Sequence, residues 1–139
     1  MFKLETSASF DSAHFLMGYK GKCANIHGHH WVAQVSIFGD ELTAQGEKRG
    51  MLIDFSDLKK AVRELCDSLD HTLIYEKGSL KDSTASALRE EGFQLTQVDF
   101  RPTAENFARF FHESLCSRGL PVKTVKIYET PDNCAVYEV

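Results

Sequence analysis

The chain has 139 residues, of which 42% are hydrophobic and 26% are charged. This balance is typical of a folded globular protein rather than a disordered or fibrous one, and the length suits a single domain with one core. The formal net charge is -4 and the basic residues are scattered, so the sequence predicts no nucleic-acid partner. No apolar run is long enough to span a membrane and no secretion signal is evident, so we expect no membrane contact and a cytoplasmic location.

Alternating apolar and polar residues predict two strands early in the chain, at residues 2–10 and 31–37. We expect both to belong to one antiparallel sheet. The polar segment 39–50, which contains three glycines, is then the loop that leaves the second strand, and residues 51–53 form a short return strand.

Two helices are predicted from apolar residues spaced three and four apart. The first carries an apolar stripe over residues 58–69, with Asp54 or Ser56 as its N-terminal cap. The second begins after Thr103, its expected cap, and carries a stripe over residues 107–115. Both stripes are expected to pack on the sheet.

Residues 122–128 and 135–139 indicate a closing hairpin. The order strand, strand, helix, helix, strand, strand predicts a single α+β domain, residues 1–139, with both helices on one face of a four-stranded antiparallel sheet. The pattern weakens between residues 75 and 100, where only a short helix at 85–89 is indicated. A segment of that length inside a compact domain is either a functional flap or a partly ordered insertion.

Four cysteines stand at positions 23, 66, 116 and 134 without a Cys-x-x-Cys pair, and the chain is long for a disulfide scaffold. We expect free thiols, three of them buried as small hydrophobic side chains. Cys23 differs because histidines surround it in the sequence.

The run His27-Gly28-His29, with His14 upstream, indicates a metal site. Side chains two apart in a strand point to the same side, so His27 and His29 can share one ion, while His30 should face away. Gly28 leaves room for a ligand to approach the backbone. Three imidazoles and one vacant position describe a catalytic zinc site. The alternative is a chance cluster of surface histidines, and the nearby thiol favours the metal.

Cys23 has two interpretations. As a fourth ligand it would close the zinc site and make it structural; beside the metal it would be a catalytic thiol that the positive charge helps to ionise. Its separation of four residues from His27 permits both.

Three acidic residues also stand out. Asp70 precedes His71, and a carboxylate can orient an imidazole and raise its basicity, although a histidine near a helix C-terminus can simply complement the dipole. Glu129 is either an exposed strand end or a buried carboxylate that accepts two hydrogen bonds from an aminopyrimidinone. Glu105 lies in the first turn of a helix, where it complements the dipole, and contact with a ligand is the less favoured alternative.

Six short motifs, in this order, resemble those of the 6-pyruvoyl-tetrahydropterin synthase family. They cover nearly the whole chain: Ser12-Ala13-His14, Cys23-x-x-x-His27-Gly28-His29, Ile53-Asp54-Phe55, Leu69-Asp70-His71, Pro102-Thr103-Ala104-Glu105-Asn106 and Tyr128-Glu129-Thr130. The three-residue spacer after Cys23 is most similar to the bacterial branch, the 6-carboxy-tetrahydropterin synthases of the queuosine pathway.

The resemblance implies a tunnelling fold, in which four-stranded sheets from several subunits join into a barrel with helices outside. It implies a homohexamer of two trimeric rings, with sites between subunits. Ala104 stands where the family commonly has a hydroxyl residue, and segment 75–100 is longer than expected. The roles that it implies are zinc ligands for His14, His27 and His29, a catalytic thiol for Cys23, a proton-transfer pair for Asp70 and His71, a pterin anchor for Glu129, and pterin-pocket lining for Thr103 and Glu105.

The implied activity is a zinc-dependent lyase reaction on 7,8-dihydroneopterin triphosphate, giving 6-carboxy-tetrahydropterin, acetaldehyde and triphosphate. Lys20 and Lys22 are the expected triphosphate contacts. One alternative is a 6-pyruvoyl-tetrahydropterin synthase, which eliminates triphosphate from the same substrate and keeps the carbon chain. Another is a non-catalytic zinc or pterin-binding protein, against which the thiol and the Asp-His pair argue.

Overall fold

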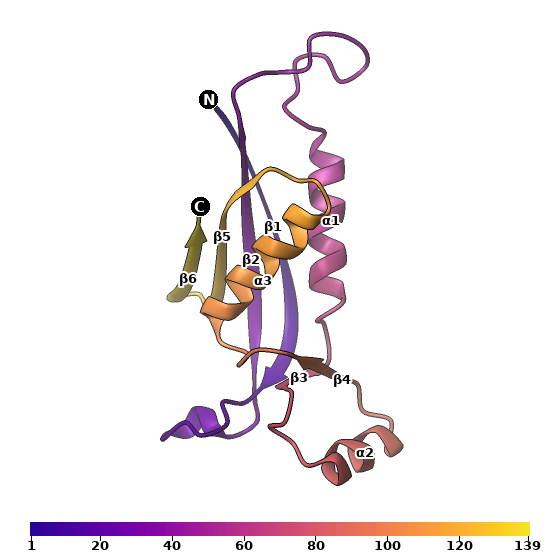
Figure 1. The fold of residues 1–139 in the computed structure, drawn as a ribbon, viewed down its shortest axis with the longest axis vertical. Helices are drawn as coiled ribbons and strands as arrows, with labels where there is room; N and C mark the ends of the chain where they lie inside the picture. Colours follow the sequence, from indigo (N-terminus) through magenta and orange to yellow (C-terminus); the bar gives the residue numbers. More distant parts are fainter.

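Two long antiparallel strands form the centre of one six-stranded sheet in the computed structural model, which describes residues 1–139 (Figure 1). The strand order across the sheet is β4-β3-β1-β2-β5-β6. In chain order the elements are β1 (Phe2–His14), the 3-10 turn η1 (Lys22–Ala24), β2 (His27–Gly39), α1 (Phe55–Asp67), β3 (Leu73–Glu76), α2 (Asp82–Glu90), β4 (Leu95–Val98), α3 (Ala104–Ser117), β5 (Val122–Thr130) and β6 (Asn133–Glu138).

The predicted α+β architecture is confirmed. Strands β1, β2, β5 and β6 pair antiparallel as expected, and α1 and α3 both pack on one face (Figure 1). The alternation in the sequence explains this packing, because every second residue of β2 from Trp31 to Ile37 is fully buried beneath the helices. Phe10 of β1 stacks between Trp31 and Phe111 of α3, with ring centroids 5.9 Å from each.

The helix starts follow the predicted capping chemistry. Asp54 rather than Ser56 caps α1, because its carboxylate accepts a hydrogen bond of 2.8 Å from the Ser56 backbone N–H. Thr103 caps α3, where its hydroxyl accepts from the Asn106 backbone N–H at 3.3 Å. Helix α1 ends at Asp67, earlier than the apolar stripe suggests, although Leu69 still packs into the core.

Segment 75–100 is not a bare loop. It holds the second half of β3, all of α2 and all of β4, and α2 includes the short helix predicted at 85–89. Strand β3 pairs parallel to the end of β1 through Ala13↔Leu73 and His14↔Ile74, and β4 pairs parallel to β3. Strands β3 and β4 therefore extend the sheet of β1, β2, β5 and β6 at the end where β1 stops (Figure 1).

The prediction of a short return strand at residues 51–53 is wrong. The backbone of Met51 bonds within its own loop, accepting from Thr43 N–H at 2.9 Å and donating to Lys48 at 3.0 Å. Leu52 lies against Gly39, at the end of β2, so the apolar residues cover the sheet end instead of joining a strand ladder.

All four cysteines are free, as expected, but only Cys66 is buried. Burial raises the pKa of its thiol to about 12, so Cys66 behaves as an inert apolar side chain. The prediction of burial is wrong for Cys116 and Cys134, which are exposed. No helix combines the length and apolar character that crossing a membrane requires.

Phe111→Ala should lower the free energy of unfolding by about 3–5 kcal/mol, because Phe111 is fully buried in the aromatic core. Urea denaturation measures this loss. Phe55→Ala is the matched control: Phe55 is 53% exposed, and its truncation should cost about 1 kcal/mol. Equal losses in the two variants would contradict the assigned core.

Candidate metal centre and active site

Three imidazoles meet at one end of the central strand pair. The register of β1 and β2 places His14 directly opposite His27, and His29 follows two residues along β2. The Nε2 atoms of His14 and His27 lie 3.1 Å apart. The ring centroids of the three pairs are separated by 4.6, 4.9 and 5.2 Å. The rings therefore converge, as the spacing of the motif predicts for a strand.

Hydrogen bonds on the outer ring nitrogens set the orientation of two of these imidazoles. His14 Nδ1 donates to the Pro102 carbonyl and His27 Nδ1 donates to the Asn25 carbonyl, both at 2.7 Å. In the neutral rings both Nε2 atoms then carry lone pairs that face each other, an arrangement that a cation between them stabilises. Around a tetrahedral ion with metal–nitrogen distances of about 2.0–2.1 Å, adjacent nitrogens lie roughly 3.3 Å apart. The observed separation fits such an ion.

His29 supplies the third nitrogen, and this atom has no hydrogen bond. Its Nε2 is buried, and although Glu129 Oε1 lies 3.0 Å away, the carboxylate is not in line with a ring N–H. An unpartnered buried nitrogen is costly, and metal ligation would satisfy it. The donor chemistry of the site therefore fits a bound cation.

Glu129 provides a fourth donor, which the sequence did not predict. The donor atoms of His14, His27, His29 and Glu129 all lie within 4.8 Å of one another. Glu129 lies two residues after Ile127, which is fully buried, so strand alternation turns its side chain toward the same layer. This two-residue spacing from an apolar strand residue was the feature of the sequence that could have placed Glu129 beside the histidines. Cys23 is not part of this donor cluster.

The indole of Trp31 forms the floor of the site, 5.0 Å from the His14 ring and 5.2 Å from the His29 ring between centroids. Burial lowers the pKa of His14 to about 4 and also lowers the pKa of His29, against the opposing charge of Glu129. Both rings are therefore neutral near pH 7, the form that binds metals.

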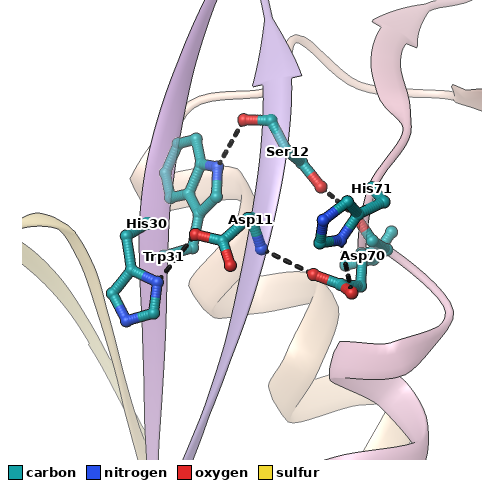
Figure 2. A network of polar contacts seen from close by, with 7 residues as sticks. Asp11, Ser12, His30, Trp31, Asp70 and His71 are labelled. Atoms are coloured by element: carbon teal, nitrogen blue, oxygen red, sulfur yellow. Dashed lines mark hydrogen bonds and ion pairs between the residues drawn. The ribbon is translucent and has the colours of Figure 1, made fainter.

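Asp70 and His71 form a second group on the other side of β1 (Figure 2). One oxygen of Asp70 accepts from the Asp11 backbone N–H at 2.8 Å, and the other accepts from His71 Nδ1 at 2.7 Å. The His71 backbone N–H returns a bond of 2.7 Å to the Asp11 carbonyl, and its φ is 51°. Asp11 also accepts from His30 Nδ1 at 2.7 Å.

These contacts fix the charge of the pair. The pKa of Asp70 is held below its usual range, mainly by the hydrogen bond from the Asp11 backbone N–H and then by the hydrogen bond from His71. In return, Asp70 raises the pKa of His71. The alternative role as a helix-terminal histidine is wrong, because α1 ends at Asp67 and His71 lies in the turn before β3. The side chain of His71 is 79% exposed and free to contact a ligand.

Two cavities lie beside the start of β2 and share Gly28, His29 and His30, but neither is lined by His14 or His27. The first cavity has a volume of about 670 Å³ and is also lined by His71 and by residues of segment 75–100 such as Phe93. The second, about 480 Å³, includes Glu129.

Other predicted site residues lie outside these two cavities. Cys23 is half-buried in η1, Thr103 caps α3, and Glu105 is exposed in the first turn of α3. Lys20 and Lys22 are exposed on the loop before Cys23.

A comparison with known protein families gives a match over nearly the whole chain. A family model described as 6-pyruvoyl tetrahydropterin synthase matches residues 3–139. The chain belongs to this family. The family consists of pterin synthases, lyase-type enzymes that act on a small pterin substrate.

Individual proteins match over nearly the full chain. A 6-carboxy-5,6,7,8-tetrahydropterin synthase from Haemophilus influenzae is 40% identical over 141 residues, covering 99% of each chain. The 6-pyruvoyl tetrahydropterin synthase of Caenorhabditis elegans has a TM-score of 0.69 at 26% identity, covering 99% of this chain and 95% of that one. An uncharacterised protein from Wolinella succinogenes shares the fold, with a TM-score of 0.80 at 21% identity over 99% and 97% of the two chains.

In an NMR pH titration, the His71 imidazole should titrate above its ordinary value of 6.5. The substitution Asp70→Asn should return the pKa of His71 toward 6.5, since Asp70 is the main cause of its shift. Because the pKa of His71 is higher in the folded than in the unfolded protein, its pairing with Asp70 stabilises the fold fully below pH 6.5. This stabilisation is lost as the pH rises through the pKa of His71 in the folded protein. Asp132→Asn, in the β5–β6 turn, is the control. A wild-type value at or below 6.5 would show that the pair does not form in solution.

Proposed function

We propose that the chain is a zinc-dependent 6-carboxy-5,6,7,8-tetrahydropterin synthase of queuosine biosynthesis, acting on 7,8-dihydroneopterin triphosphate. The observation that carries the proposal is the convergence of three histidine nitrogens, one of them buried without a hydrogen bond, beside a carboxylate. The full-length similarity to a Haemophilus influenzae protein of that name supports the choice of reaction.

His14, His27 and His29 are the proposed zinc ligands. Imidazole nitrogens suit zinc, and three protein ligands leave the fourth position for the substrate. The carbonyls of Pro102 and Asn25 hold two of the rings in the tautomer that ligation needs. When bound, zinc supplies Lewis-acid polarisation of the side-chain oxygens of the substrate.

Glu129 is the proposed pterin anchor. Its carboxylate can accept two hydrogen bonds from the amino and ring N–H groups of an aminopyrimidinone, a bidentate contact that selects this edge. Because Oε1 lies 3.0 Å from His29, a pterin held there has its side chain beside the histidines. Thr103 and Glu105 are proposed to line the pterin pocket from the start of α3, next to the Pro102 carbonyl that holds His14.

Cys23 and the Asp70–His71 pair are the proposed proton-transfer groups. Cys23 as a thiolate removes a carbon-bound proton from the substrate side chain, and His71, oriented by Asp70, returns or relays protons. Lys20 and Lys22, on the loop before Cys23, are the proposed contacts for the triphosphate.

A homohexamer of two trimeric rings is the proposed assembly. Strands β4 and β6 are the two edges of the sheet, and unpaired edges invite pairing with another copy. Cys23 lines neither cavity beside the histidines of its own chain. Sites completed between subunits, as in the family, account for both features.

The proposed reaction breaks the bond between the first and second side-chain carbons in a retro-aldol-type step. The first carbon stays on the ring as the carboxyl group, the two outer carbons leave as acetaldehyde, and triphosphate departs with consumption of one water. Zinc-loaded protein incubated with 7,8-dihydroneopterin triphosphate should therefore give a carboxylated tetrahydropterin and acetaldehyde by mass spectrometry. A pyruvoyl pterin would instead identify the other branch of the family, and unreacted substrate would identify a binding protein.

Cys23→Ala is the control for this experiment. The variant should keep its fold and its zinc while forming no product, because the thiol is the proposed base and lies outside the donor cluster. Circular dichroism and metal analysis measure the first two properties. Zinc loss in Cys23→Ala would make the thiol a ligand and contradict its catalytic role.

Glu129→Ala should weaken pterin binding about a hundredfold, because it removes two hydrogen bonds to a charged acceptor. Zinc affinity should change far less, since the three histidines remain. Fluorescence titration with pterin and competition with a zinc chelator measure the two affinities separately. The opposite pattern, with zinc lost and pterin binding intact, would make Glu129 a metal ligand.

A further inference from the structure

The loop that joins β1 to β2, residues 15–26, carries Cys23 in η1 and projects from the end of the central strand pair (Figure 1). We call it the Cys23 loop. Hydrogen bonds inside the loop set its shape, such as the bond of 2.9 Å from the Leu16 N–H to the Cys23 carbonyl. Side-chain hydrogen bonds reach the loop from two residues outside it, His27 at the start of β2 and Arg101. Arg101 is therefore its hydrogen-bonded link to the rest of the domain.

Arg101 lies between β4 and α3 and contacts the Cys23 loop at two points. Its Nη2 donates to the Met17 carbonyl at 2.9 Å, and its Cζ lies over the Tyr19 ring, 6.0 Å from the centroid. The Tyr19 ring in turn lies against Gly21, where an added Cβ would come 2.8 Å from the ring carbon Cε1. Gly21 stands two residues before Cys23. The contacts of the guanidinium group thus continue through the loop to the turn that carries the thiol.

The backbone of Arg101 is itself fixed by the start of α3. Its carbonyl accepts from the Thr103 backbone N–H at 2.7 Å and from the side-chain amide of Asn106 at 2.9 Å. The next residue, Pro102, is buried, and its carbonyl accepts from His14. Two adjacent residues of one short link therefore orient a proposed zinc ligand and hold the loop of the proposed catalytic thiol.

The surroundings of Arg101 favour an arginine only through these loop contacts. Its Nε is buried without a hydrogen-bond partner, and burial of an unpaired polar group lowers stability. A planar guanidinium group, however, can donate to a carbonyl and stack on an aromatic ring at the same time, which the compact ammonium group of lysine does not do. The contacts with Met17 and Tyr19 use both properties.

We propose that Arg101 is a positioning residue, which holds the Cys23 loop in the place where the Cys23 thiol meets the substrate. This inference rests on the proposed function. A catalytic base must lie within hydrogen-bond reach of the proton that it removes, and a misplacement of about 1 Å can lower the rate about a hundredfold. Because Arg101 and the loop belong to the same chain, the role is the same whether the thiol serves the metal centre of its own chain or that of another copy.

Arg101→Lys tests the position of the loop while it keeps the charge. Iodoacetamide labelling of the zinc-loaded protein without substrate, followed by peptide mass spectrometry, measures each cysteine separately. Cys23 should react about tenfold faster than in the wild type, because a loosened loop exposes a thiol that is half-buried. The exposed Cys116 and Cys134 and the buried Cys66 should keep their wild-type rates.

Turnover shows whether the position of the loop matters for the reaction. With 7,8-dihydroneopterin triphosphate, Arg101→Lys should lower kcat about tenfold to a hundredfold and leave the zinc content unchanged. Wild-type kcat would show that a positive charge is sufficient and would contradict the proposal. Arg109→Lys is the matched control, because Arg109 of α3 also lies over a tyrosine ring, with its Cζ 5.9 Å from the centroid of Tyr137 in β6. Its labelling and turnover should equal those of the wild type.

Gly21→Ala is a second variant, which disturbs the same contact from the other side and decides the matter if Arg101→Lys does not fold. The backbone of Gly21 is extended, with a φ of 167°, so alanine can adopt it. The added methyl group must displace the Tyr19 ring, which it would otherwise meet at 2.8 Å. Faster labelling of Cys23 and a lower kcat are expected here as well.

The pattern of labelling separates a local role from a general one. Faster labelling of the buried Cys66 together with Cys23 would show that the whole fold has loosened and would overturn the proposal. Unchanged labelling of Cys23 in both variants would also overturn it, while leaving the proposed function intact. A loosened loop in the variants combined with no turnover by the wild type would overturn the proposed function and, with it, the role of Arg101 in the reaction.

Discussion

The register between β1 and β2 is the constraint on which the rest of the structure depends. The two strands pair over their whole length, from Phe2↔Gly39 to His14↔His27. Because side chains alternate between faces, a slip of one residue would move Trp31 out of the core and send His27 and His29 to the opposite side. Burial of one face and convergence of the three rings are thus consequences of a single pairing.

The core and the candidate metal centre form one continuous layer. Trp31 packs against Phe107 of α3 at 5.0 Å between ring centroids, and on its other side it contacts His14 and His29. Ligand rings supported in this way have little freedom to turn, which favours a defined coordination geometry. Burial also keeps His14 neutral, so the packing that fixes the ring also sets its charge.

The sequence predicts the centre of the fold better than its ends. Alternation identified β1 and β2, but exposed polar residues such as Asp11, near the end of β1, and His30, near the start of β2, hid how far the strands extend. The four-residue strands β3 and β4 are too short to show a period, and they form because of pairing with distant partners. Residues 51–53 are apolar because they cover the sheet end, which periodicity cannot distinguish from a strand.

The candidate site divides in the same way. Spacing alone was enough to bring His27 and His29 to one side. His14 and Glu129 were candidates from the sequence, and the resemblance chose between their alternative roles. The approach of Glu129 to His29 and the clamp that Asp11 places on Asp70 depend on contacts between distant segments. Their geometry becomes visible only when the sheet is assembled.

One long-range contact ties the candidate metal centre to a distant part of the chain. The carbonyl that orients the His14 ring belongs to Pro102, 88 residues further along, whereas the three histidines all lie within the first 29 positions. The first 29 residues therefore carry all three imidazoles of the candidate metal centre but not the group that orients the first of them. The geometry of this centre depends on the docking of the segment that leads into α3.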